Sequence, residues 1–453
     1  MFTALALLIA LALIASAVVS PLWFAVVALV TGALPTSLGV DQVFATPLGR
    51  LDVAALRLFA LLAGSAIVVA FQLRNAAPYA ARSALHVAFL VFCVVSLSYA
   101  VTPVYGLRML AKLIAPLLFL LALLATVRSL RDVELLNRAV LASGVLIGGL
   151  ALATKILGIN PDSRFNLPGM GPSVFSAHLM VVGMLAFATF LTQRKWLPLF
   201  FSLALLFSIV AAFTRITILA AFLGAAVVAV LALRGPIRIV LPLAGVVGGP
   251  ALFLLSERFR SRMFIDSQAA SVEQVLADPG AVAGNVRGSG RFALWDDLMS
   301  RFFEPRPAFG SGIGTTQGYL YESSGGIGVA HSDYVRLLCE VGLIGTGLFV
   351  AAMCVYLVRA IAANRRLRGD PLRAFPIAAA GGLVSYLVFM ATDNGLDYVS
   401  QVGIYVFALV AMSEKALAIR RAAPLPAGAS ATDSRLPNVL PHEPVRVLRR
   451  QTP

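Results

Sequence analysis

Residues 197–233 read LPLFFSLALLFSIVAAFTRITILAAFLGAAVVAVLAL, and Arg215 is their only charged residue. A helix needs about 20 consecutive apolar residues to span a bilayer. The stretch therefore predicts two membrane spans, 197–212 and 216–233, joined by a tight turn around Arg215.

The same pattern recurs along most of the chain of 453 residues. Hydrophobic residues make up 59% of it and charged residues 13%, and the mean hydropathy is +0.90. Soluble domains average about 45–50% apolar and about 25% charged residues, so the composition excludes a soluble enzyme, a secreted disulfide scaffold and a disordered protein. The apolar runs are continuous, whereas the strands of an outer-membrane barrel alternate apolar and polar residues. The sequence predicts an all-α polytopic membrane protein.

We expect about 12 transmembrane helices, and they divide the chain into four parts. Helices 1–9 occupy 1–255, a large periplasmic loop follows at 256–332, helices 10–12 lie in 333–418, and 419–453 form a disordered basic cytoplasmic tail. The expected spans are 3–20, 53–72, 84–100, 109–127, 136–155, 174–191, 197–212, 216–233, 239–255, 333–358, 374–392 and 400–418. The first span either continues to residue 34 or splits at Pro21 into a hairpin, which would make thirteen.

The formal net charge of +15 is spread over many connections and forms no single basic patch. The connections on one side, with the C-terminal tail, hold almost twice as many Lys and Arg residues as the other side. The positive-inside rule places the basic side in the cytoplasm and the long loop in the periplasm. This distribution argues against nucleic acid as a partner. Cys93, Cys339 and Cys354 all fall in apolar spans, where we expect small buried residues.

Two arginines in outer connections are candidate phosphate ligands. Arg215 either holds an anionic group with its planar guanidinium or anchors the helix at the lipid headgroups. Arg291 and Trp295, in Gly-Ser-Gly-Arg-Phe-Ala-Leu-Trp, share a helix face because they are four residues apart. Arg291 is either a second phosphate ligand or the partner of a nearby acidic residue, and Trp295 suits headgroup depth.

The glycine-rich segment 310–318 lacks the Lys-Ser/Thr ending of a P-loop and the spacing of a dinucleotide-binding loop. It is either a flexible turn or a small nest of backbone amides for an anion. No spacing of His, Cys, Asp or Glu resembles a metal site, so we predict no metal and no cofactor.

The motif His-Ser-Asp-Tyr begins at His331, where the long loop re-enters the membrane. Ser332 or Asp333 is a credible helix N-cap. His331 is either a general base for a hydroxyl or a capping and interfacial residue. Arg336 and Glu340 are four residues apart on the same helix and are expected to neutralise each other.

The other histidines and a polar cluster near residue 393 are weaker candidates for the site. His86 and His442 are expected to be structural or incidental, whereas His178 follows a polar outer loop and is a candidate ligand contact. Asp393, together with Asn394 and Asp397, forms a small polar cluster between the last two helices that is a candidate lining of the site.

The order of these motifs resembles the bacterial O-antigen ligase and O-antigen polymerase family of membrane glycosyltransferases. The likeness covers roughly residues 197–418. It comprises the Arg in a short outer turn, the long outer loop with Gly-Arg and Trp, the Gly-x-Gly-x-Gly segment, His-Ser-Asp-Tyr running into Glu-x-Gly-Leu-x-Gly, and the late Asp-Asn-x-x-x-Tyr turn. His331-Ser332 replaces the His-Asn of many ligases, which leans towards the polymerases.

The resemblance implies a GT-C-like fold in the bacterial inner membrane, with the active site facing the periplasm. It implies a metal-independent transfer of a glycan from an undecaprenyl-diphosphate carrier to a glycan or lipid A-core acceptor. Arg215 and Arg291 would hold the diphosphate, and His331 would be the base. Arg336, Trp295, Asp333 and Asp393 would contact substrate. A transporter or flippase of the lipid-linked oligosaccharide, a protein O-oligosaccharyltransferase and an assembly scaffold remain alternatives.

Overall fold

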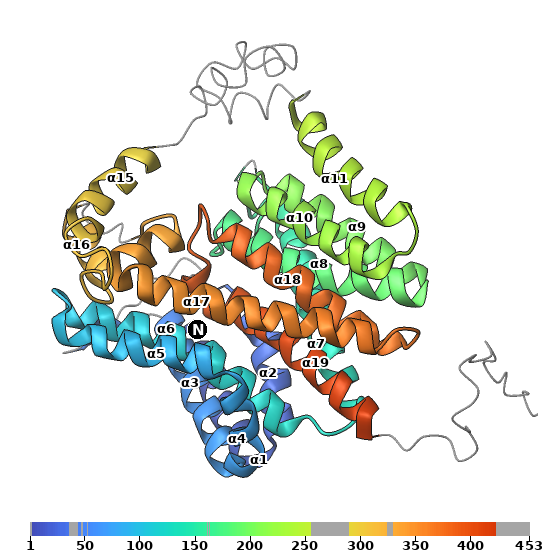
Figure 1. The fold of residues 1–453 in the computed structure, drawn as a ribbon, viewed down its shortest axis with the longest axis horizontal. Coiled ribbons are helices and arrows are strands. Elements are labelled where there is room, and N and C mark those ends of the chain that lie inside the picture. The colour runs from blue at the N-terminus through green and yellow to red at the C-terminus, as the bar shows by residue number, and fades with distance from the viewer. Residues whose placement is uncertain are drawn as a thin grey trace, which may run out of the picture.

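The computed structural model describes residues 2–35, 44–46, 49–51, 53–160, 162, 164–254, 290–323 and 329–422. Helices make up most of these residues (Figure 1). The α-helices are α1 (Phe2–Val19), α2 (Pro21–Gly32), α3 (Val53–Phe71), α4 (Leu73–Arg82), α5 (Ala84–Ser96), α6 (Pro103–Thr126), α7 (Leu130–Ile156), α8 (Pro172–Gln193), α9 (Trp196–Ala211), α10 (Arg215–Ala232), α11 (Ile237–Leu254), α15 (Arg291–Leu298), α16 (Thr315–Ser323), α17 (Asp333–Arg366), α18 (Ala374–Phe389) and α19 (Ile404–Ala422).

Short helical turns and one two-stranded ribbon complete the described structure. The turns are η1 (Leu97–Tyr99), η2 (Met299–Phe303), η3 (Pro371–Arg373), η4 (Gly395–Asp397) and η5 (Val399–Gly403). Strands β1 (Phe44–Thr46) and β2 (Gly49–Leu51) pair antiparallel.

Eight helices of the described residues are long and apolar enough to cross a membrane, and counting a bent pair raises the number to nine. The all-α polytopic class is thereby confirmed, while the count of twelve stays a prediction. The eight are Val53–Phe71, Pro103–Thr126, Leu130–Ile156, Pro172–Gln193, Arg215–Ala232, Asp333–Arg366, Pro371–Phe389 and Val399–Ala422. The shorter apolar helices are Leu7–Val19, Pro21–Gly32 and Trp196–Ala211.

Two expected connections have more structure than a loop. The first apolar stretch is divided at Ser20, and Pro21 begins α2, because proline suits the first turn of a helix. The expected connection 73–83 is mostly helix α4, which meets α5 at an angle of 88°. This bent pair is either a broken span or a re-entrant loop.

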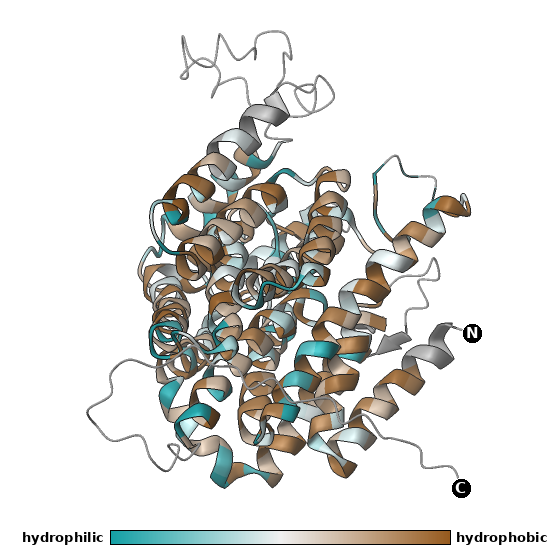
Figure 2. Cartoon of the chain, turned by 90° about the vertical axis from the view of Figure 1, so that its right-hand side faces the viewer, coloured by the Kyte–Doolittle hydropathy of each residue, from teal (hydrophilic) through white to brown (hydrophobic). Residues whose placement is uncertain are grey.

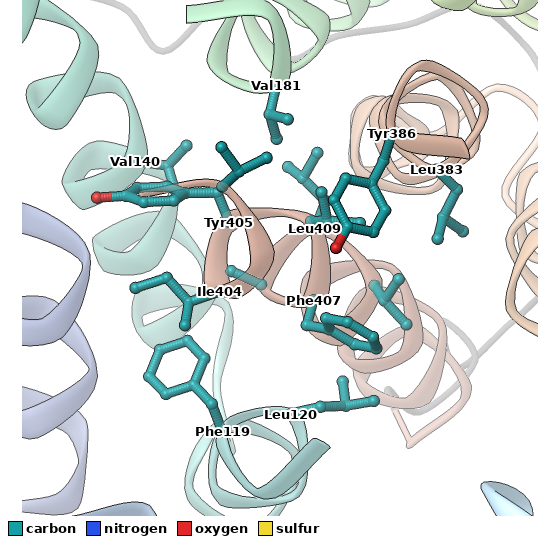
Figure 3. Close-up of a cluster of buried hydrophobic side chains, with 14 of the residues drawn as sticks. Phe119, Leu120, Val140, Val181, Leu383, Tyr386, Ile404, Tyr405, Phe407 and Leu409 are labelled. Carbon is teal, nitrogen blue, oxygen red and sulfur yellow. The ribbon is translucent and has the colours of Figure 1, made fainter. Parts of the chain in front are cut away.

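Helix α19 lies at the centre of the bundle. Its Tyr405 is fully buried, and neighbouring side chains come from α6, α7, α8 and α18 (Figure 3). Hydrophobic residues are frequent along the helices on the outside of the molecule (Figure 2). Phe59, Phe71 and Phe207 are each more than 60% exposed. In water such exposure would be costly, so this surface suits contact with lipid.

Helix α17 runs across the molecule, with α15 and α16 beside one of its ends (Figure 1). Its 34 residues are interrupted at Gly342, whose φ of 64° is not helical. The segment 290–323 of the expected periplasmic loop is therefore folded against this helix. The rest of that loop, 255–289 and 324–328, and the tail from 423 lie outside the described residues.

Candidate active site

The site begins at the entry to α17. Ser332 is the N-cap, because its hydroxyl accepts the N–H of Val335 at 3.3 Å. His331 precedes it with a φ of 54°, in the left-handed region that few non-glycine residues adopt. The N–H of His331 donates to the side-chain oxygen of Asn394 at 3.0 Å. The backbone of His331 is thus held at the mouth of the helix.

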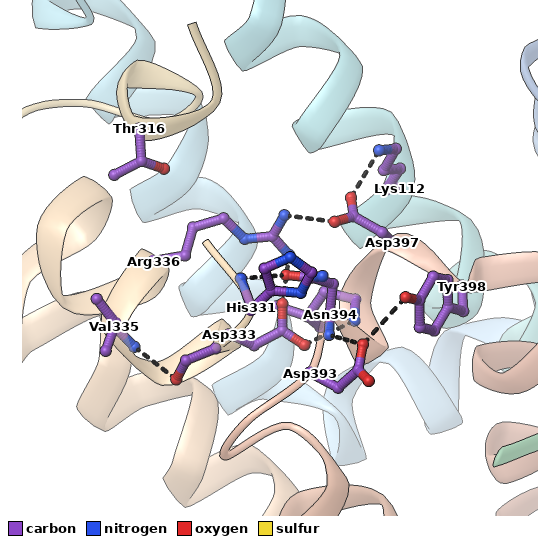
Figure 4. Close-up of polar contacts among 12 residues, drawn as sticks. Lys112, Thr316, His331, Asp333, Val335, Arg336, Asp393, Asn394, Asp397 and Tyr398 are labelled. Atoms are coloured by element: carbon purple, nitrogen blue, oxygen red, sulfur yellow. Dashed lines mark hydrogen bonds and ion pairs between the residues drawn. The ribbon is translucent and has the colours of Figure 1, made fainter. Parts of the chain in front are cut away.

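The turn between α18 and α19 forms the other wall. Asp393 accepts the N–H of Asn394 at 2.8 Å and the hydroxyl of Tyr398 at 3.0 Å. Met390 accepts the N–H of Asp333 at 3.0 Å, so the turn is also bonded to the start of α17. The expected polar cluster of the last two helices therefore lies directly beside His331 (Figure 4).

A buried set of ion pairs lies beneath these residues. Arg336 pairs with Asp333 at 2.5 Å and with Asp397 at 2.9 Å, and Lys112 pairs with Asp397 at 2.6 Å. Burial raises the pKa of Asp397, but the charges of Arg336 and Lys112 outweigh burial and hold this pKa at about 2. The second oxygen of Asp333 accepts the N–H of Leu396 at 2.9 Å.

This network corrects the expected pairing of Arg336 with Glu340 on α17. Arg336 pairs with Asp333 and Asp397 rather than with Glu340, which instead accepts the hydroxyl of Thr316. Arg336 and Asp333 are both at most 2% exposed. Their side chains are engaged in these ion pairs, which suits a role in positioning the entry of α17, while the Nε of Arg336 is buried without a hydrogen-bond partner among the described residues.

Helix α15 brings Arg291 and Trp295 to the same place. Arg291 donates to the carbonyl of Thr392 at 2.7 Å, and Trp295 donates to the carbonyl of Ala330 at 2.8 Å. These two acceptors directly precede Asp393 and His331 in the chain. Among the described residues, Arg291 forms no ion pair with an acidic residue; nearby Asp297 pairs with Arg301 instead.

The electrostatics of His331 follow from these neighbours. Its side chain is half-buried, and burial lowers its pKa, the positive charge of Arg291 lowers it further, and Asp393 opposes them. The result is a pKa below the ordinary value of about 6.5. At neutral pH the imidazole is uncharged, which is the form that accepts a proton.

The glycine-rich segment is neither a flexible turn nor a free anion nest. The N–H groups of Ser311 and Gly312 donate to the carbonyls of Cys339 and Glu340, at 2.8 and 2.9 Å, and that of Ile313 to the hydroxyl of Ser96 at 3.2 Å. These amides are used inside the protein. The segment fills the break of α17, and a Cβ at Gly342 would come within 2.5 Å of the carbonyl of Ala308.

Arg215 begins α10 at the same end of the bundle as His331. Helices α10 and α18 are antiparallel, because Gly224 packs on Ser385 while Val228, further along α10, packs on Gly381. The N-terminal end of α10 therefore lies beside the end of α18 that leads to Thr392. The Arg215 side chain is half-buried, next to a hydrogen bond of 2.6 Å between Thr214 and Ser176.

The other histidines and the cysteines have structural settings. His178 is fully buried and hydrogen-bonded to the carbonyl of Gln401 at 2.9 Å, so it is a core residue and not a ligand contact. His86 is buried beside Tyr356, as expected, and His442 lies outside the described residues. Cys93 and Cys339 are buried, whereas Cys354 is exposed on the outside of its helix, contrary to expectation.

No group of three or more His, Cys, Asp or Glu residues that could hold a metal ion occurs in the part of the chain that the structure describes.

The sequence did not predict two residues that take part in the buried polar contacts around α17. Lys112 lies on α6, 285 positions before its partner Asp397, and Thr316 lies 24 positions before Glu340. No local spacing pointed to either contact.

Residues 200–350 match the family described as O-antigen ligase, and no curated protein matches the chain. The matched segment contains Arg215, Arg291, Trp295, His331 and Arg336, while the turn with Asp393 and Asn394 follows it. The match confirms, over residues 200–350, the resemblance drawn from the order of the motifs.

Proposed function

We propose that this protein transfers or polymerises an undecaprenyl-diphosphate-linked oligosaccharide at the periplasmic face of the inner membrane. The family match supports a glycosyltransferase of the O-antigen ligase or polymerase type acting on a lipid-linked glycan and an acceptor. The acceptor hydroxyl belongs to a glycan or to lipid A-core. The finer assignments below are proposals that rest on the contacts around His331.

The observation that carries the proposal is the meeting of an uncharged histidine and an arginine at one helix mouth. The Asn394 side chain and the Ser332 cap fix the backbone on both sides of His331. Arg291 is close enough to lower the pKa of His331 and is itself held by the carbonyl of Thr392. A base and a cation in fixed places suit a reaction in which a hydroxyl attacks and an anion leaves.

In the proposed step, the acceptor hydroxyl gives its proton to the imidazole of His331. Its oxygen attacks the anomeric carbon of the donor sugar and forms the new glycosidic bond. The bond from that carbon to the carrier diphosphate breaks, and the diphosphate leaves with the electron pair. Arg291 and Arg215 stabilise the charge that develops on the leaving group, because preorganised cations act most strongly where charge appears in the transition state.

The surrounding residues have supporting roles. Trp295 and Asp393 border His331 and are proposed to contact the substrate. Arg336 and Asp333, buried in ion pairs, are proposed as positioning residues that hold the entry of α17 against the turn. No metal takes part in the proposed reaction.

A complementation experiment tests this function. A deletion strain would receive wild type, His331→Ala, Arg291→Ala or the control Arg301→Gln, which removes an exposed arginine of the same segment. Surface polysaccharide would be resolved on a gel, lipid-linked donor extracted, and membrane levels of each variant checked by immunoblot. We expect the first two variants to lose the polymer or the capped glycan and to accumulate donor in the outer leaflet, while the control keeps its product.

The outcome also separates the alternatives. Normal polysaccharide from well-expressed His331→Ala and Arg291→Ala variants would reject the catalytic assignment and favour a scaffold. Donor that accumulates only in the cytoplasmic leaflet would favour a flippase. Loss of chain length points to polymerisation, and loss of capping with intact chains points to ligation.

A further inference from the structure

A second polar feature lies at the opposite end of α17 from His331. It is an open pocket of about 420 Å³, and five arginines contribute to its lining: Arg234, Arg238, Arg365, Arg368 and Arg373. Arg234 precedes α11 and Arg238 lies in its first turn, while the other three come from the end of α17, the residues after it and the turn η3. We call it the arginine pocket. It has no part in the proposed transfer reaction.

The charge of the arginine pocket is not balanced by the described residues around it. Its lining contains no acidic residue, and none of its five arginines forms an ion pair with a described acidic residue. Asp370 and Glu414 are engaged in other ion pairs, Asp370 with Arg420 at 3.0 Å and Glu414 with Arg359 at 2.7 Å. Like charges repel at short range, so this grouping favours an anionic ligand.

One of the five arginines is fixed, and the others are exposed to a ligand. Arg373 donates to the carbonyl of Leu231 at 2.6 Å and to the side-chain oxygen of Asn364 at 3.0 Å. Asn364 is itself buried, with 5% exposure. These contacts join α10, α17 and η3 into a rigid floor. The other four arginines are exposed at the rim: Arg234, Arg238, Arg365 and Arg368.

The walls of the arginine pocket are apolar and face the lipid. Val230, Leu231 and Ile361 line it, and Val230 is 45% exposed on a membrane-spanning helix. The arginines stand where α10 and α17 end. A pocket that is apolar towards the bilayer and cationic at the ends of its spans lies at the depth of lipid headgroups.

We propose that the arginine pocket binds the phosphate headgroup of an anionic phospholipid. The planar guanidinium donates two parallel hydrogen bonds to phosphate oxygens, and basic pockets between membrane helices suit such headgroups. A free phosphate compound offers the same anion but no acyl chain for Val230 and Ile361. If the positive-inside assignment holds, the bound lipid belongs to the cytoplasmic leaflet.

The test measures lipid retained by the purified full chain. Native mass spectrometry would count bound lipids after incubation in detergent with phosphatidylglycerol or phosphatidylcholine, and titration would give their affinities. The variants are Arg365→Gln with Arg368→Gln, and the control Arg131→Gln with Arg366→Gln, which removes the same charge from exposed arginines outside the lining. Competition with inorganic pyrophosphate separates the lipid from a free anion.

We expect wild type to retain phosphatidylglycerol in preference to phosphatidylcholine. The affinity for it should fall about 25-fold in the pocket variant, since each arginine near an anionic headgroup contributes a factor of about five. The control should bind like wild type. Equal binding of the two lipids, equal loss in the control, or binding of pyrophosphate without phosphatidylglycerol would each overturn the proposal. None of these results depends on transfer activity.

Discussion

His331 shows how one residue can be set by neighbours that lie far away in sequence. Its backbone is in the left-handed region, and its N–H donates to the side chain of Asn394. The charges of Arg291 and Asp393 act on the pKa of its ring in opposite directions. Such strain at a non-glycine residue is held only when the surroundings determine it. The sequence predicted the residue and its cap, but the conformation depends on the turn that follows α18.

The two charged neighbours of His331 predict opposite changes in the pH dependence of transfer. Arg291 lowers the pKa of His331, so Arg291→Gln should raise this pKa and move the acidic limb of the rate profile to higher pH. Asp393 raises the pKa, so Asp393→Asn should move the limb to lower pH. The residual rates would be measured in vitro with a lipid-linked donor across a pH series.

The control for these two variants is Arg301→Gln, which should leave the limb in place. If Arg291→Gln and Asp393→Asn shifted it in the same direction, or not at all, His331 would not be the group whose titration limits transfer.

Arg336 predicts a large effect on stability. Arg336→Met would leave Asp333 buried without its cation and Asp397 with Lys112 alone, and breaking a buried ion pair in this way typically costs about 3–5 kcal/mol. Lys112→Met should cost less, because Asp397 keeps Arg336 and the Lys112 side chain is partly exposed. Thermal unfolding in detergent, followed by size-exclusion chromatography, would rank the two variants. Equal stabilities would show that Arg336 does not hold the network together.

At the scale of elements, the sequence predicted apolar helices well and their contacts poorly. Hydropathy is a local property, so runs such as 216–233 and 400–418 correspond to α10 and to η5 with α19. The amides of the glycine-rich segment donate to carbonyls of α17 that follow about 30 residues later in the chain. The spacing of its glycines does not predict these acceptors. The pairing of Lys112 with Asp397 was hidden for the same reason.

The break in α17 makes a prediction for Gly342. Its φ of 64° and the 2.5 Å approach of the Ala308 carbonyl leave no room for a side chain. Gly342→Ala should therefore destabilise the protein by about 1–3 kcal/mol. Gly347→Ala, on the same helix with nothing within 4 Å of its Cβ, is the matched control and should be neutral or slightly stabilising. A similar unfolding temperature for both variants would contradict this account of the break.

The whole molecule presents one charged end with His331 and another with the arginine pocket, separated by the apolar bundle. The positive-inside rule assigns the arginine end to the cytoplasm. Reporters test this directly. Alkaline phosphatase fused after Lys195 should be inactive and fused after Phe213 should be active, because the first point lies on the basic side. The opposite pattern would invert the topology and place His331 in the cytoplasm.

A fusion near Ser37 would decide between twelve and thirteen spans.

The docking of the glycine-rich segment on α17 also sets an order for biogenesis. Residues 310–314 leave the ribosome before Cys339, Glu340 and Gly342, to which their amides and glycines are fitted. In the proposed topology, this outer segment would cross the membrane before the residues of α17 that bind it have been synthesised. In that topology, docking of the segment in the break of α17 would bring it to the proposed site, so synthesis of α17, α18 and α19 would complete the site as well as the membrane domain.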